Sequence, residues 1–182
     1  MSKDEVLNDA RGAEQYPDSA DGCVVFAFDR DYTVDVNPPP RDDQEAVPLE
    51  WVRYLAHETE HIVFATGNQL LREEADIPGI PTMLDLHPEP EEYAGPPEMW
   101  GRHRPRRADR SRMLAEIYPN ADRYIVVDDA DLSDLEGWEY YPSWEFVPKA
   151  RDDAFPFDPG TALATVECDL QRPVDDWALR NY

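Results

Sequence analysis

Residues 22–37 read Gly-Cys-Val-Val-Phe-Ala-Phe-Asp-Arg-Asp-Tyr-Thr-Val-Asp-Val-Asn. The uninterrupted apolar run at 23–28 predicts a strand that is buried on both faces of a sheet. It stops at Asp29, and Asp31 and Thr33 follow at intervals of two residues. Open α/β sheets bind ligands beyond the carboxyl ends of their strands, so we expect these side chains at a binding edge. Residues two apart on an extended segment share a face, and converging carboxylates need a cation or a proton between them.

Length and charge limit the kind of protein this is. A chain of 182 residues can bury one core, and we expect a flexible acidic leader at 1–20 and a single domain at 21–182. The chain has 17 basic and 40 acidic residues, a formal net charge of −23, and only two of the basic residues are lysines. This composition favours a halophilic, salt-rich cytoplasm, where screening removes most self-repulsion; an acidic protein of ordinary habitat is the alternative.

The same features argue against two classes of partner. A strongly negative surface repels phosphates, which excludes general binding to nucleic acid. The chain shows no secretory signal and no apolar run long enough to span a bilayer, so we expect a cytoplasmic protein without membrane association.

Apolar runs in the first half of the chain alternate between the helical and the extended pattern. Helical spacing at 49–56 precedes a second buried strand at 62–65. A second helix is expected to begin near Gln69, and the run at 80–86 is predicted as a third strand although Pro81 lies inside it.

The second half continues the alternation. The segment 89–105 is rich in Pro, Gly and Glu and is predicted as a surface loop that crosses the mouth of the site. A helix is expected at 107–118, buried strands at 124–127 and 144–147, and a short helix in the tail from Thr161. The predicted fold is α/β, a Rossmann-like three-layer sandwich with a mostly parallel central sheet.

Three of the expected strands end in residues that suit phosphoryl transfer. Beyond their carboxyl ends lie Asp29 with Asp31, Thr66, and Asp128 with Asp129. A carboxylate can attack phosphorus and form an acyl phosphate that water then hydrolyses. A neighbouring carboxylic acid can protonate the leaving oxygen and later deprotonate the water. A basic residue and a divalent ion with oxygen ligands, typically Mg²⁺, would neutralise the phosphoryl oxygens in the transition state.

This arrangement resembles the haloacid dehalogenase-like (HAD) phosphohydrolase superfamily. The first motif of that family, Asp-x-Asp-x-Thr at the end of the first strand, corresponds to 29–33, which reads Asp-Arg-Asp-Tyr-Thr. The second motif, a Thr or Ser after a hydrophobic strand, corresponds to Thr66. The fourth motif, an acidic pair after a later strand, corresponds to Asp128 and Asp129.

The resemblance implies a role for each of these positions. Asp29 would be the nucleophile and Asp31 the general acid and base. Thr66 and Gly67 would contact the phosphate oxygens. The metal site for Mg²⁺ would consist of Asp29, Asp31 through its backbone carbonyl, Asp128 and Asp129.

The third motif is the weakest match. The family usually places a Lys, sometimes an Arg, at the start of the helix before the fourth-motif strand. No lysine lies between Lys3 and Lys149, so an arginine must serve. Arg107 begins the expected helix and is the first choice, and Arg110 is the second. Both would bind phosphate.

Within the family, the first motif is similar to that of capless phosphatases that act on histidinol phosphate and heptose bisphosphate. Those proteins have Gly where Tyr32 stands and commonly carry a cysteine-rich zinc loop, which this chain lacks. Their substrates are therefore not carried over. The intervals 33–66 and 66–107 leave no room for a large cap domain. An open site favours a macromolecular phosphosubstrate, or a phosphorylated small molecule held by the 89–104 segment or by a partner that completes the pocket.

The resemblance predicts a Mg²⁺-dependent phosphatase that works through an aspartyl-phosphate intermediate. The alternative is a HAD-fold binding or regulatory protein with little or no turnover, because an arginine stands in place of the usual lysine and Tyr32 is unusual at its position.

Overall fold

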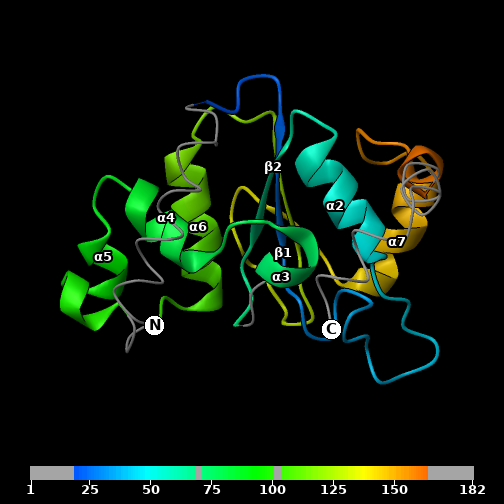
Figure 1. Ribbon diagram of the computed structural model, residues 1–182, viewed down its shortest axis with the longest axis horizontal. Coiled ribbons are helices and arrows are strands. Elements are labelled where there is room, and N and C mark those ends of the chain that lie inside the picture. The colour runs from blue at the N-terminus through cyan, green and yellow to red at the C-terminus, as the bar shows by residue number, and fades with distance from the viewer. Residues whose placement is uncertain (1–18, 69–70, 101–103, 164–182) are drawn as a thin grey trace, which may run out of the picture.

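Four parallel strands form a sheet between two layers of helices (Figure 1). The computed structural model describes residues 19–68, 71–100 and 104–163. Residues 1–18 of the expected leader and 164–182 of the C-terminal segment therefore lie outside the described residues. The α/β architecture with a parallel central sheet, predicted from the sequence, is confirmed.

The most buried strand lies in the middle of the sheet. The strands are β1 (Val24–Phe28), β2 (Ile62–Ala65), β3 (Arg123–Val127) and β4 (Glu139–Tyr141), in the order β2-β1-β3-β4. β1 pairs with β2 on one side and with β3 on the other, and all five of its residues are buried. A strand with neighbours on both edges and helices on both faces has no solvent-facing position, which explains its continuous apolar run.

Helices cover both faces of the sheet. One side carries α4 (Ile80–Leu86) and α6 (Arg107–Ile117), and the other carries α2 (Leu49–His57) and α7 (Ser143–Arg151) (Figure 1). The shorter elements are α3 (Arg72–Ala75), α5 (Glu91–Ala94) and the 3-10 helix η1 (Pro97–Met99). No helix among the described residues combines the length and the apolar character that crossing a membrane requires.

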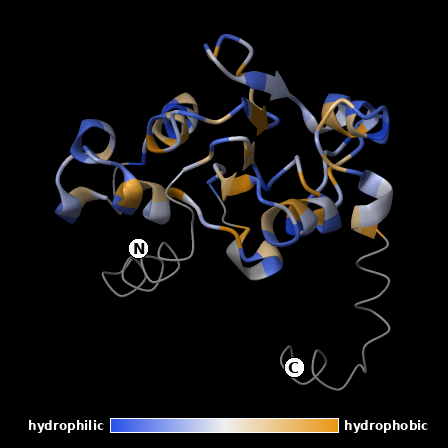
Figure 2. Ribbon diagram, turned by 90° about the horizontal axis from the view of Figure 1, so that it is seen from above, coloured by the Kyte–Doolittle hydropathy of each residue, from blue (hydrophilic) through white to orange (hydrophobic). Residues whose placement is uncertain are grey.

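Alternate residues of β1 point into two separate cores. Phe26 and Phe28 belong to a cluster with Trp51 of α2 and Phe146 of α7, and all four side chains are almost fully buried. Val25 and Ala27 of the same strand belong to the opposite cluster, with residues of α4 and α6. Burying one such side chain contributes about 1.5–3 kcal/mol. Figure 2 shows the result, with hydrophobic strands at the centre and helices that carry both kinds of residue.

The prediction of a strand at 80–86 is wrong, because this segment is helix α4. Pro81 lies in its first turn, where a backbone N–H has no partner within the helix, so the proline that argued against a strand is compatible with a helix start. Gly79 precedes the helix with extended backbone angles. Met83 and Leu84 are buried in the cluster next to α6.

The prediction of a last strand at 144–147 is also wrong, because these residues lie in α7. Phe146, Val147 and Ala150 are buried and lie on one helical face, which a short apolar run does not distinguish from a buried strand. The fourth strand is β4, immediately before this helix, and its three residues are only partly buried. An edge strand of this kind has no strong hydrophobic pattern.

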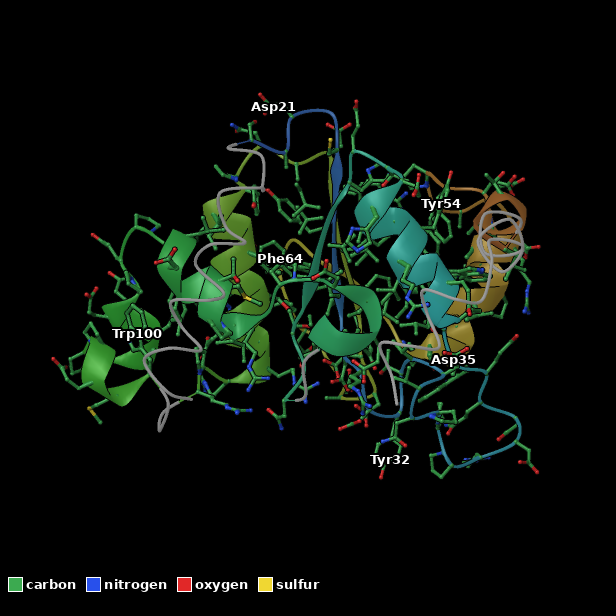
Figure 3. All side chains as sticks on the ribbon, viewed as in Figure 1. Asp21, Tyr32, Asp35, Tyr54, Phe64 and Trp100 are labelled. Carbon is green, nitrogen blue, oxygen red and sulfur yellow. The ribbon has the colours of Figure 1, made fainter. Side chains whose placement is uncertain are left out.

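The expected loop at 89–105 contains α5 and η1, and none of its described residues lines the pocket at the strand ends. Figure 3 shows Trp100 at the outer edge of the α4 and α6 side, far from Tyr32 beyond the lower end of the sheet. Residues 101–103 are outside the described residues. Arg104, which follows them, returns to the site and donates from Nη1 to the Asn68 carbonyl at 2.8 Å.

Candidate active site

The carboxyl ends of β2, β1 and β3 lie side by side at one edge of the sheet. The backbone pairing continues one residue beyond the strands: the Asp29 N–H donates to the Val127 carbonyl, and the Thr66 N–H donates to the Phe28 carbonyl, both at 2.9 Å. Asp128, which directly follows Val127, is therefore held beside Asp29. Thr66 lies 37 positions after Asp29 in the sequence, and Asp128 lies 62 positions after Thr66. The three residues meet because the strands that precede them are parallel and end at the same edge of the sheet.

Three carboxylates gather at this edge. Asp29, Asp128 and Asp129 each offer one oxygen, and these three atoms lie within 4.8 Å of one another. Asp29 is 3% exposed and Asp128 is fully buried, whereas Asp129 faces solvent. A site that offers only carboxylate oxygens suits a hard divalent ion, so this group could hold Mg²⁺.

Arg107 supplies positive charge to the same point. Its Nη1 atom lies 2.9 and 2.7 Å from the two carboxylate oxygens of Asp128 and 3.1 Å from Oδ1 of Asp29. Arg107 is the first residue of α6, so the N-terminus of that helix carries the cation to the strand ends. Of the two arginines predicted from the sequence, the structure brings this one to the carboxylates.

Burial shifts both of the inner carboxyl groups toward their protonated forms. The pKa of Asp29 is raised from its ordinary 3.8 to about 7, mainly by burial and then by the charge of Asp128, while Arg107 acts in the opposite direction. Burial also raises the pKa of Asp128, again against the effect of Arg107. A bound divalent ion would favour the ionised form of both groups.

Arg110 lies one turn further along α6 and contacts only uncharged oxygens. It donates from Nε to the Pro105 carbonyl at 2.9 Å, from Nη1 to the Thr66 carbonyl at 2.8 Å and from Nη2 to Oδ1 of Asn68 at 2.9 Å. Its side chain is buried, and burial lowers its pKa to about 10, with the neighbouring positive charges of Arg107 and Arg104 acting the same way. Arg110 therefore ties the loop after β2 to α6.

Thr66 and Gly67 leave space and an unused donor next to Asp29. The Oγ1 atom of Thr66 is buried and has no hydrogen-bond partner within the described residues. A Cβ atom on Gly67 would lie only 2.0 Å from Oδ1 of Asp29, so no other residue fits at this position without displacing that carboxylate. The hydroxyl can donate to a phosphate oxygen, which would satisfy a buried polar group.

Asp31 lines the same pocket and is held by two neighbouring side chains. Its Oδ1 accepts from Nη1 of Arg30 at 2.7 Å and from Nδ2 of Asn37 at 3.0 Å. Arg30 also donates from Nε and Nη2 to Oε1 of Glu74, in α3, at 3.0 and 2.8 Å. Both contacts to Asp31 use the same carboxylate oxygen, which leaves Oδ2 to exchange a proton.

A pocket of about 220 Å³ opens between these groups. Its lining consists of Asp29, Asp31, Tyr32, Asn68, Arg107 and Asp129. The volume is below the roughly 300–1,000 Å³ of sites that enclose a whole small ligand. The pocket is therefore of a size for a phosphoryl group and an ion, with the rest of a substrate outside.

Several residues at the site were not predicted from the sequence. Asn68 follows Thr66 and Gly67 directly, so its position after the second strand was a usable signal. Asn37 and Glu74 carried no such signal, because their contacts with Asp31 and Arg30 depend on how a turn and a short helix fold back onto the strand end.

Comparisons of this chain with protein-family models, with curated proteins and with solved structures found no match. The geometry of the site is therefore the basis for any functional conclusion.

Proposed function

We propose that this protein is a Mg²⁺-dependent phosphatase of the capless HAD type, which hydrolyses a phosphate monoester through an aspartyl phosphate. The observation that carries the proposal is the position of Asp29. Its buried carboxylate lies 3.1 Å from the Arg107 guanidinium and within 4.8 Å of oxygens of Asp128 and Asp129. A nucleophile for phosphorus needs an adjacent cation and a site for a divalent ion, and both are available here.

The residues around the pocket can divide the reaction into two balanced steps. In the first, Asp29 forms a bond to phosphorus, the bond from phosphorus to the ester oxygen breaks, and Asp31 donates its proton to that oxygen. In the second, Asp31 takes a proton from water, the water oxygen bonds to phosphorus, and the bond to Asp29 breaks to release phosphate.

The remaining groups would stabilise charge and position the phosphoryl group. Arg107 can neutralise a phosphoryl oxygen, and the unpartnered hydroxyl of Thr66 can donate to another. Asp29, Asp128 and Asp129 would hold the divalent ion, which supplies further positive charge to the phosphoryl oxygens when it is bound. The small pocket leaves the leaving group outside, so phosphorylated macromolecules and phosphorylated metabolites are both compatible with it.

Hydrolysis of p-nitrophenyl phosphate tests this proposal directly. In molar salt with Mg²⁺ we expect turnover by the wild type and a loss on the order of 10³-fold or more in Asp29→Asn, because the nucleophile is removed. Asp43→Asn is the matched control, since that carboxylate is 68% exposed and pairs with Arg41. Mass spectrometry of acid-quenched enzyme should find the phosphoryl group on the peptide that contains Asp29. Full activity in Asp29→Asn would sink the mechanism.

One observation supports the alternative of a binding protein with little turnover. Nη1 of Arg107 contacts carboxylate oxygens of both Asp29 and Asp128, so an ion or a phosphate must compete with an existing ion pair. Calorimetric titration with Mg²⁺ separates the two functions. Binding without hydrolysis of any phosphate ester favours the binding protein, and binding with Asp29-dependent hydrolysis favours the phosphatase.

A further inference from the structure

Tyr32 is an exposed aromatic residue at the rim of the pocket. It is 46% exposed, whereas the aromatic side chains of the two cores are almost fully buried. It lines the same pocket as Asp29 and Arg107. Figure 3 shows it beyond the lower end of the sheet, projecting away from the body of the molecule. A ring in this position is available to a substrate that enters the pocket.

The backbone holds this ring in a costly conformation. Tyr32 has φ of 60°, in the left-handed region that glycine adopts without strain. A residue with a side chain is disfavoured in this conformation, because its Cβ atom lies too close to the following carbonyl oxygen. The turn is nevertheless fixed on both sides: the Tyr32 N–H donates to the Asn37 carbonyl at 2.7 Å, and the Val34 N–H donates to the Arg30 carbonyl at 3.0 Å. Strain that is held in place at a site indicates a use for the side chain.

The leaving group would pass this ring. Asp31, the proposed acid, must reach the ester oxygen, and Tyr32 is the next residue along the same turn. Both residues line the pocket and Tyr32 is exposed at its rim, so a group bonded to the ester oxygen can reach the Tyr32 ring. An aromatic group bonded directly to that oxygen would meet the tyrosine ring as soon as it leaves the pocket, and two rings stack favourably.

We propose that the preferred substrates are aryl phosphate monoesters, whose leaving-group ring stacks on Tyr32. This inference rests on the proposed phosphatase activity and names its substrate class. The charge of the site agrees with it, because Asp31 and Asp129 line the pocket and the chain carries a net charge of −23. A leaving group with further phosphates would be repelled, whereas an uncharged ring is not.

O-phosphotyrosine and O-phosphoserine provide the test, since both are phosphorylated amino acids and only one has a ring. The measured quantity is the ratio of kcat/KM for phosphotyrosine to that for phosphoserine in molar salt with Mg²⁺. We expect this ratio to fall about 5- to 20-fold in Tyr32→Gly and to stay within about twofold of wild type in Tyr32→Phe, which keeps the ring. Asp153→Gly is the control, because Asp153 also has a left-handed φ, of 61°, and does not line the pocket.

The outcomes separate the two proposals. An unchanged ratio in Tyr32→Gly, with both esters hydrolysed, would overturn the role of Tyr32 and leave the phosphatase intact. Hydrolysis of neither of these esters nor of p-nitrophenyl phosphate by the wild type would overturn both. If Tyr32→Gly fails to fold, as judged by its thermal transition, Tyr32→Asn takes its place, because Asn tolerates the same backbone conformation.

Discussion

Two arginines one turn apart on α6 do opposite things. Arg107 lies against two buried carboxylates, at 2.7 Å from Asp128 and 3.1 Å from Asp29. Arg110 is more deeply buried, yet its three hydrogen bonds go to two carbonyls and an amide oxygen, including that of Asn68. Arg107 therefore pairs with carboxylates that can take part in a reaction. Arg110 instead holds two backbone carbonyls and a side-chain amide in place.

The difference shows what distinguishes a reactive cation from a structural one in this protein. Burial alone does not, because Arg110 is the more buried of the two. The partner decides: Arg107 lies between ionisable groups that a ligand can also bind, whereas all three guanidinium nitrogens of Arg110 donate to neutral oxygens of the fold. We therefore expect substitutions at 107 to affect activity first and substitutions at 110 to affect stability first.

The largest effect is expected at Arg107. Replacement by Ala removes the cation beside the nucleophile, and kcat/KM for p-nitrophenyl phosphate should fall about 100- to 1,000-fold. Arg107→Lys keeps the positive charge and should retain more activity than the Ala variant. Arg106→Ala is the matched control, since that side chain is 85% exposed and pairs with Asp109. Equal activities in the wild type and Arg107→Ala would end the assignment.

Substitution of Arg110 should reduce stability more than substitution of Arg107 does. Arg110→Met leaves two buried carbonyl oxygens and the Asn68 amide oxygen without their donor, and the free energy of unfolding in urea should fall by about 2–4 kcal/mol. Arg107→Ala, measured at pH 6, should lose less, because Asp29 can take up a proton when its cation is removed. The distinction between a structural Arg110 and a reactive Arg107 would be wrong if Arg110→Met had the same urea midpoint of unfolding as the wild type and lost as much activity as Arg107→Ala.

The carboxylate side of the comparison should also respond to pH. The pKa of Asp29 is higher in the folded protein, at about 7, than its ordinary 3.8, so its favourable contribution is complete below about pH 4 and is lost as pH rises through 7. Without divalent ions the thermal midpoint should therefore fall between pH 5 and 8 by about 3 °C more in the wild type than in Asp29→Asn. Adding Mg²⁺ at pH 8 should restore the midpoint of the wild type alone. A restoration of equal size in the Asn variant would place the ion elsewhere.

A third arginine combines both behaviours and should give the smallest effect. Arg30 contacts Asp31 and is held by Glu74. In Glu74→Gln the ion pair that holds Arg30 is lost, so the contact by which Arg30 orients Asp31 is weakened. We expect kcat to fall about three- to fivefold, because the proposed acid is less well positioned. Asp43→Asn, at a solvent-exposed ion pair, is the control. An unchanged kcat would make Glu74 only a structural residue.

The pattern of the sequence predicted much of the fold and of the site because the relevant signals are local. β1 and β2 are buried throughout and β3 is buried at its last three residues, so each contains a continuous apolar run, and the acidic or hydroxyl residues at their ends were visible in the sequence. The segments 80–86 and 144–147 were mistaken for strands because a short apolar run has no period that separates a strand from the buried side of a helix.

The sequence by itself determined the order of strand and acid, and with it the meeting of Asp29 and Asp128 at one edge, since parallel strands must end together. Only the tertiary structure decided which arginine of α6 reaches those carboxylates and how Asp31 is held by Arg30 and Asn37. The physical reason is the distance along the chain over which each feature is determined. The burial of a strand can be predicted from neighbouring residues, whereas the partner of a charged side chain depends on how elements distant in the chain pack together.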